Sequence, residues 1–165
     1  MTWKLPPQSS FTFGKHSEAE LAGFEFPVHP KLQAVTRLAL AISGCDFGIH
    51  DGVRTVAEGE ANFVAGTSRT HHSKHQDGLA VDAVPWSNGK MSWRPDHCFQ
   101  VAVAHQLASR FLRIPIIWGG AWDRMLAELV GTPKIAHQAY VERFERANPG
   151  TKALVDLVHF QLVLP

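Results

Sequence analysis

The stretch Ser73-Lys74-His75-Gln76-Asp77-Gly78-Leu79-Ala80-Val81-Asp82 carries the strongest structural signal in this chain. Its Asp77-Gly78 pair is typical of a tight turn, because glycine tolerates the positive φ that such turns need. The apolar residues 79–84 then predict a short strand, in which Asp82 points to the opposite face from its two neighbours. An ionised carboxylate in so apolar a strand is costly unless a partner neutralises it. A divalent cation bound by both Asp82 and His75 would do so, since carboxylate oxygens and histidine nitrogens are normal zinc ligands.

A second histidine lies in an apolar, strand-like run near the C-terminus, Val155-Asp156-Leu157-Val158-His159-Phe160-Gln161-Leu162. His159 would be a third ligand beside His75 and Asp82. Three protein ligands leave a fourth position for water, which is the catalytic form of a zinc site. Asp156 is then available as the general base for that water. A regular strand would place Asp156 and His159 on opposite faces, so this interpretation requires Asp156 to lie in a loop or bulge just before the strand.

These motifs, taken in order, resemble a known family of enzymes. Ser-x-His-x-x-Gly-x-Ala-x-Asp, followed near the C-terminus by Asp-x-x-His, is similar to the zinc peptidases of the D-alanyl-D-alanine carboxypeptidase and dipeptidase superfamily. Within it, the chain most resembles phage endolysins that act as L-alanyl-D-glutamate peptidases. Further landmarks of the resemblance span nearly the whole chain: Phe11–Ser17, Gly52-Val53-Arg54-Thr55, Gly66-Thr67-Ser68 and Trp118–Asp123.

The resemblance implies a role for each residue of the candidate site. It implies zinc as the cofactor, held by His75, Asp82 and His159, with Asp156 as the base that takes a proton from water and returns it to the leaving amine. In the family, the arginine of Gly-x-Arg-Thr lies at the active site. Arg54 is therefore expected to bind a substrate carboxylate or carbonyl and to stabilise developing negative charge.

Three further polar residues lie close to His75 in sequence. Ser73 is expected to contact the substrate or to fix the site by hydrogen bonding, the alternative being an ordinary turn serine. His71 and His72 are not expected to be ligands, because neighbouring side chains diverge and the family uses only the histidine after Ser-x.

Two enzyme functions and one binding function remain open at this point. The resemblance implies an endolysin that cleaves the L-alanyl-D-glutamate bond of the peptidoglycan stem peptide and so lyses the host. A D-Ala-D-Ala carboxypeptidase or dipeptidase would use the same metal chemistry with a pocket for a free C-terminal carboxylate. A non-catalytic, zinc-stabilised binding module is the third alternative, and the presence of both Asp156 and Arg54 argues against it.

Composition narrows the class of protein. With 165 residues, 45% of them hydrophobic and 19% charged, we expect a single soluble domain, residues 1–165, without a separate cell-wall-binding domain. A net charge of +1 gives no electrostatic reason to expect nucleic acid as a partner. No signal peptide or apolar membrane span is evident, so we expect synthesis in the host cytoplasm, no stable membrane insertion and a monomer. The resemblance implies that a separate membrane-permeabilising protein lets the enzyme reach the wall.

The two cysteines and one alanine bear on other bound groups. Cys45 and Cys98 fit no metal or redox spacing and are expected to be reduced. Some relatives bind calcium through acidic residues near a Gly-Gly-Asp-Trp motif. In this chain Ala121 replaces that aspartate, which makes calcium regulation doubtful.

The pattern of apolar residues predicts an α+β fold, in which a small, mainly antiparallel sheet carries the zinc site and helices pack on one face. The family resemblance implies that this fold is of the Hedgehog and DD-peptidase type. Strands are expected at 47–53, 79–84 and 114–118 and around His159, with Pro85 ending the second. Helices are expected from about 18 (capped by Ser17 with Glu20), from 30 to 43, from 55 to 65 and from 95 to 112, with two more within 123–152.

Two further side-chain patterns concern the 95–112 helix and the tryptophans. Phe99, Val103, Leu107 and Phe111 form the expected core face of the 95–112 helix. Trp86, Trp93, Trp118 and Trp122 would either pack in the core or line a groove for peptidoglycan sugar or peptide.

Overall fold

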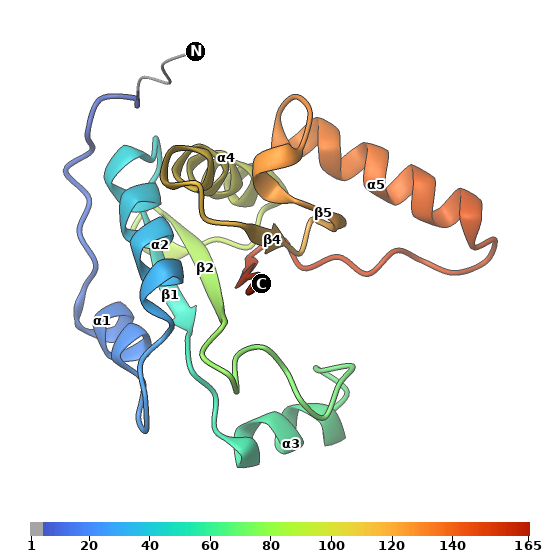
Figure 1. The fold of residues 1–165 in the computed structure, drawn as a ribbon, viewed down its shortest axis with the longest axis horizontal. Helices are drawn as coiled ribbons and strands as arrows, with labels where there is room; N and C mark the ends of the chain where they lie inside the picture. Colours follow the sequence, from blue (N-terminus) through green and yellow to red (C-terminus); the bar gives the residue numbers. More distant parts are fainter. Residues whose placement is uncertain (1–4) are drawn as a thin grey trace.

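The computed structural model describes residues 5–165, so residues 1–4 of the predicted domain lie outside the described part. The chain has the predicted α+β fold (Figure 1). The α-helices of the described part are α1 Lys15–Ala22, α2 Pro30–Ile42, α3 Val56–Val64, α4 Pro95–Leu112 and α5 Pro133–Ala147. The strands are β1 Phe47–Asp51, β2 Ala80–Ser87, β3 Lys90–Met91, β4 Ile116–Trp118, β5 Ala121–Met125 and β6 His159–Leu162, with a short 3-10 helix, η1, at Leu126–Glu128.

The sheet has the strand order β1-β2-β6-β4-β5, with β3 paired to β2, and every pairing is antiparallel. The last strand, β6, is therefore inserted in the middle of the sheet, between β2 and β4. Its register places His159 directly opposite Asp82 on β2. Directly opposed residues in an antiparallel pair have side chains on the same face, so the topology alone brings two predicted ligands together.

Helices α2 and α4 pack against each other and against the sheet. Alternate strand residues, among them Phe47, Ile49, Val81 and Phe160, are buried in the main core with these helices. Asp82 follows Val81 and points away from that core. Helix α1 lies along the free edge of β1, where the Ser17 hydroxyl accepts a hydrogen bond from Ile49 N–H at 2.9 Å. This covers an edge strand that would otherwise offer unpaired backbone groups.

Two predicted boundaries are wrong. Helix α1 begins at Lys15 after Gly14, and Ser17 serves as the partner of β1 described above instead of as a helix cap. Strand β2 continues through Pro85 to Ser87. Proline has no N–H, but β2 needs none at this position. The Trp86 N–H donates to the Asp46 carbonyl on the β1 side, so the backbone of Pro85 faces the other side of β2, beyond the end of β6. On that side the Pro85 carbonyl accepts a hydrogen bond from Ser92 N–H at 2.8 Å.

The core face of α4 also differs from the prediction. The helix has the predicted bounds, but Val103 and Phe111 of the expected stripe are 37% and 48% exposed. The buried face consists mainly of small residues, including Cys98, Ala102, Ala104 and Ala108. Small side chains allow a helix to approach its neighbours closely, and this close packing prevailed over the burial of the larger residues.

Of the two helices predicted within 123–152, the structure has one α-helix, α5, and only the short 3-10 helix η1 in place of the other. The apolar residues at 125, 126, 129 and 130 match a helical period over too short a window. The Gly119-Gly120 turn instead folds residues 121–125 back on β4 as strand β5. Helix α5 follows and ends at Ala147, with Asn148 as its C-cap.

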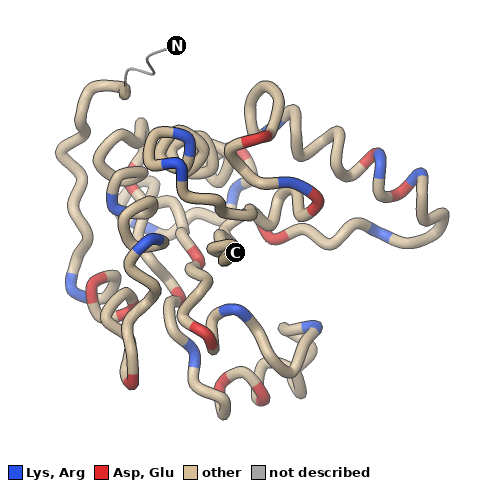
Figure 2. Tube along the Cα trace, in the orientation of Figure 1, with Lys and Arg blue, Asp and Glu red and all other residues tan. Residues whose placement is uncertain are grey.

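Three further features concern the described chain as a whole. Cys45 and Cys98 are free thiols, and burial raises the pKa of Cys98 to about 11. No described helix combines the length and the apolar character that crossing a bilayer requires. Acidic and basic residues are interspersed along the trace (Figure 2).

Helix α4 buries one titratable group against the sheet. His105 is fully buried, its ring stacks on Phe160 with centroids 3.9 Å apart, and its Nε2 has no hydrogen-bond partner among the described residues. Burial lowers the pKa of His105 to about 4. As the pH falls, His105 is therefore protonated near pH 6.5 in the unfolded chain but only near pH 4 in the folded chain.

We expect His105→Leu to reduce the acid sensitivity of folding. In the wild type this histidine lowers the free energy of unfolding by about 1.4 kcal/mol for each pH unit below its ordinary pKa, down to the folded pKa. Urea titrations between pH 7 and pH 4 should therefore show a flatter pH dependence for His105→Leu, with exposed His16→Leu as the control. Equal slopes for His105→Leu and the wild type would contradict this account.

Candidate metal centre and catalytic groove

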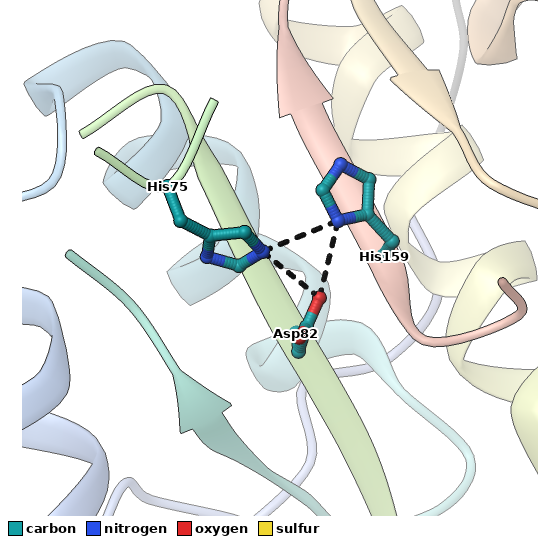
Figure 3. Close-up of side chains that lie close together, drawn as sticks. All are labelled: His75, Asp82 and His159. Carbon is teal, nitrogen blue, oxygen red and sulfur yellow. Dashed lines mark hydrogen bonds and ion pairs between the residues drawn. The ribbon is translucent and has the colours of Figure 1, made fainter. Parts of the chain in front are cut away.

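The three predicted ligands lie together on the face of the sheet opposite α2 and α4 (Figure 3). His75 comes from the turn before β2, Asp82 from β2 and His159 from the first position of β6. The His75 Nε2 atom lies 3.3 Å from both His159 Nδ1 and Asp82 Oδ1. The third side of the triangle, from His159 Nδ1 to Asp82 Oδ1, is 3.2 Å. Within residues 5–165 this is the only cluster of three or more potential metal ligands.

The size and chemistry of this triangle fit a tetrahedral metal ion. Arms of about 2.0–2.1 Å, which zinc makes to nitrogen and oxygen, give a tetrahedron with edges of about 3.3–3.4 Å. The three observed edges of 3.2–3.3 Å match that geometry. Two imidazoles and one carboxylate also form a donor set that suits zinc, and the fourth corner remains for water or substrate.

Each histidine is oriented by a hydrogen bond from its other ring nitrogen. His75 Nδ1 donates to the Gly52 carbonyl at 2.7 Å, which leaves the Nε2 lone pair facing the site. His159 Nε2 lies 3.1 Å from Gln161 Oε1, which leaves Nδ1 for the metal. Such partners fix the tautomer and the ring orientation of metal ligands. Sequence reasoning missed both; Gln161 could have been found as the residue two positions along the same strand, whereas a backbone carbonyl carries no side-chain signal.

The charges at the site favour an ionised carboxylate. Burial alone would raise the pKa of Asp82, but hydrogen bonds from His159 and His75 outweigh it and hold that pKa well below its usual range. For His75, burial alone would lower the pKa, but the hydrogen bond and the negative charge of the adjacent Asp82 outweigh burial, so the pKa of His75 is raised. The ionised Asp82 carboxylate therefore favours a positive charge next to it, and a bound cation would supply that charge.

Asp156 lies in the loop just before β6, as the interpretation of the sequence required. Its N–H donates to the Gly119 carbonyl at 2.9 Å, and its own carbonyl accepts from His159 N–H at 3.3 Å. Burial raises the pKa of its carboxyl group, and the negative charge of Asp82 raises it further. Asp156 therefore lines the metal site without belonging to the ligand triangle.

Gly119 leaves no space for a side chain beside this loop. A Cβ at Gly119 would lie 2.2 Å from the Asp156 carbonyl oxygen and 3.0 Å from its Cβ. The Trp118 Nε1–H also donates to the Leu157 carbonyl at 2.9 Å, so the β4 end of the hairpin fixes the Asp156 loop from two sides.

If Asp156 is the general base expected from the sequence, Gly119→Ala should lower kcat/KM by at least about tenfold, because the Asp156 loop must move away from the new methyl group and a displaced base transfers protons poorly. Steady-state kinetics of the purified variant measure this. Gly14→Ala is the matched control, since a Cβ there meets nothing within 4 Å. Equal losses in both variants would show that Gly119 does not position the loop.

Arg54 is held at the side of the groove by a neighbour that sequence reasoning missed. Its Nε donates to Asp51 Oδ2 at 3.1 Å and its Nη2 contacts the same oxygen, while its backbone N–H bonds to the His75 carbonyl at 3.1 Å. The Arg54 side chain is only 13% exposed. These contacts restrict the guanidinium to one region of the site wall.

The remaining polar residues near His75 separate into two groups. Ser73 lines the groove, and its buried hydroxyl has no hydrogen-bond partner among the described residues. His71 instead pairs with Glu60 at 3.0 Å, and His72 pairs with Asp77 at 2.7 Å. As predicted, neither of these two histidines belongs to the ligand cluster.

A groove with a volume of about 560 Å³ contains the metal centre. Residues 66–70 of the loop after α3 line part of the groove, and Leu154 and Val155 of the segment returning from α5 line another part. The Trp122 ring lies beside His159, with centroids 5.2 Å apart, and lines the groove. Trp118 is fully buried and belongs to the core instead.

Three potential metal ligands on an antiparallel sheet, a nearby carboxylate outside the ligand set and a groove lined by Arg54 are the features of a metal-dependent hydrolase site. The sequence profile of the family described as "Phage L-alanyl-D-glutamate peptidase" matches residues 9–129. The L-alanyl-D-glutamate peptidase of Escherichia phage T5 is 42% identical over 118 residues, which cover 69% of this chain and 83% of the phage protein. The chain therefore belongs to the phage L-alanyl-D-glutamate peptidase family.

A solved structure extends the likeness beyond residue 129. The crystal structure of the L-Ala D-Glu endopeptidase ChiX from Serratia marcescens superposes with a TM-score of 0.64 at 31% sequence identity. The match covers 92% of this chain and 90% of ChiX. The predicted family is confirmed.

Proposed function

We propose that this protein is a zinc-dependent endopeptidase that hydrolyses the L-alanyl-D-glutamate bond of the peptidoglycan stem peptide and so lyses the host cell. Family membership supports the bond and the substrate. The ligand triangle of 3.2–3.3 Å on the groove wall is the observation that supports metal-assisted hydrolysis. His75, Asp82 and His159 would hold the ion. When bound, zinc supplies Lewis acidity toward a carbonyl oxygen and lowers the pKa of water.

Asp156 is the proposed general base and acid. It would accept a proton from the attacking water and then donate it to the leaving amine of D-glutamate. Its raised pKa suits the first task, because a carboxylate with a raised pKa accepts a proton more readily than that of an ordinary aspartate. An aspartate is one methylene shorter than a glutamate, so its position must be well fixed, and the contacts of its loop with β4 supply that constraint.

Arg54 is proposed to bind the substrate and to stabilise negative charge. Its pairing with Asp51 restricts the side chain, so that little conformational entropy is lost when it binds a second carboxylate or a developing oxyanion. D-glutamate in the stem peptide carries a carboxylate close to the scissile bond, which is a ligand that a guanidinium binds well. Ser73 is proposed as a further substrate contact, supported by its partnerless hydroxyl at the groove wall.

The protein is proposed to act as a monomer and as a single catalytic domain. All ligands, the base and the arginine come from one chain, which supports a site that needs no second subunit. A single main hydrophobic core includes residues from both ends of the described chain, such as Leu21 and Leu162. We further propose that the enzyme is made in the host cytoplasm and reaches the wall after a separate protein permeabilises the membrane.

Metal analysis of the purified protein tests the zinc assignment. We expect one metal equivalent per chain, loss of peptide hydrolysis after chelation and recovery on adding zinc. Hydrolysis at the full rate by protein shown to be metal-free would contradict the proposal. If another divalent ion restored hydrolysis and zinc did not, the metal site would stand, but its metal would be that other ion.

A further inference from the structure

A second cavity, of about 620 Å³, lies apart from the ligand residues and plays no part in the chemistry described above. Its lining is mainly apolar and comes from β1, β2 and Met91 on β3, and its polar residues are Asp46, His50, His16, Ser17 and Thr12. It therefore lies where the segment before α1, the edge strand and the β2–β3 hairpin meet.

This cavity belongs to the same face of the sheet as the metal centre. Along β2, side chains alternate between faces, so Asp82, Val84 and Trp86 share one side. Val84 and Trp86 line the cavity, whereas Asp82 is a ligand in the groove. Four strand residues span roughly 13 Å, so Trp86 lies at about that distance from Asp82 along the strand. The two sites can therefore contact one extended ligand that lies across this face.

Two exposed tryptophans lie at or beside the cavity: Trp86 lines it, and Trp93 contacts the lining residue His50. Trp86 is 41% exposed, and Trp93 is 56% exposed. The Trp86 indole lies over Gly48, where a Cβ would come within 2.9 Å of Nε1, so the absence of a side chain on β1 leaves room for the ring. Trp93 packs edge-on against His50, with ring centroids 5.6 Å apart.

This combination of groups suits a sugar. The C–H groups on one face of a pyranose ring pack well on an indole, while hydroxyl and acetamido groups hydrogen-bond to carboxylates and imidazoles. Asp46 and His50 supply such groups next to Trp86. A purely apolar ligand would leave these polar side chains without partners when it excluded water.

In the proposed substrate, the sugars lie at a distance from the scissile bond that matches the distance between the metal centre and Trp86. In peptidoglycan, the L-alanine of the stem peptide is joined through a lactyl group to N-acetylmuramic acid, so the glycan lies less than about 10 Å from the scissile carbonyl. One further sugar reaches the distance that separates Trp86 from the metal centre. An enzyme that binds the peptide in the groove must therefore accommodate the glycan near it.

We propose that the cavity beside Trp86 is a glycan subsite, which binds an N-acetylhexosamine residue of the strand whose stem peptide lies in the catalytic groove. The inference rests on the proposed peptidoglycan substrate, but it concerns binding and not hydrolysis.

Binding to peptide-free glycan strands tests the subsite without any peptide cleavage. We expect the wild-type protein to co-sediment with purified strands, Trp86→Ala to bind about tenfold more weakly, and Trp93→Ala to be weakened as well. Phe24→Ala is the matched control, because Phe24 is 93% exposed and lines neither site. Trp93 is more exposed than Trp86, so its variant retains the test if Trp86→Ala does not fold. No binding by the wild type, or equal binding by both tryptophan variants and the wild type, would overturn the proposal.

Kinetics separate this proposal from the proposed function. The wild type should cleave a disaccharide-linked stem peptide with a kcat/KM about tenfold above that for the sugar-free peptide, and Trp86→Ala should lose most of that ratio. Equal rates for the two substrates in the wild type would overturn the glycan subsite and leave the peptidase assignment intact. Glycan binding without cleavage of either substrate would retain the subsite and contradict the peptidase.

Discussion

Asp156→Ala is expected to lose about 10²–10⁴-fold in kcat/KM on a stem-peptide substrate while it still binds one metal ion. The residue lies in the groove beside the ligand triangle and outside it, so the metal ligands remain complete when its carboxylate is removed. The reaction then lacks the group that takes the proton from water and returns it to the leaving amine. Steady-state hydrolysis and metal content, measured on the same preparation, test both halves of the prediction.

Two control variants sharpen this experiment. Asp156→Asn keeps the size of the side chain and should lose as much activity as the alanine variant, because an amide cannot accept the proton. Asp123→Ala removes an aspartate that pairs with Arg143 at 2.7 Å on the surface, and should behave like the wild type. Loss of metal from Asp156→Ala would show that Asp156 is a ligand and that the base lies elsewhere.

Asp82→Ala is expected to abolish both metal binding and hydrolysis. The carboxylate contributes one corner of the triangle and lies within 3.3 Å of both imidazole nitrogens, so its removal leaves only two ligands. Loss of an outer-shell partner alone typically costs 10–100-fold in metal affinity. We therefore expect a loss of more than about 100-fold here, measured by isothermal titration with zinc.

His159→Ala should reproduce that loss, because it removes another corner of the same triangle. His72→Ala serves as the negative control, since His72 pairs with Asp77 and lies outside the ligand cluster. Wild-type zinc affinity in Asp82→Ala would contradict the site described here.

Two of the three candidate ligands could be predicted from the sequence because each disturbs a local pattern. Asp82 and His159 are polar residues in apolar strands, and such residues require a partner. The register that pairs them could not be predicted, since it depends on the insertion of β6 between β2 and β4. Strand order in a sheet is set by contacts between distant residues, which no local window contains.

The supporting contacts were largely beyond the reach of the sequence. The Gly52 carbonyl that orients His75 is a backbone group, which every residue has. Gly119 could be recognised as part of a turn, but its closeness to Asp156 exists only in the folded chain. The core face of α4 was misread for a related reason: the size of the apolar residues suggested one face, and packing distance selected another.

Mass spectrometry of purified peptidoglycan digested by the zinc-loaded protein tests the central claim most directly. The account predicts released peptides with a new N-terminal D-glutamate, which disappear when a chelator is present. Loss of terminal D-alanine without any such peptide would contradict it and indicate a carboxypeptidase. Intact peptidoglycan after incubation with protein shown to contain zinc would contradict the assignment of a peptidase altogether.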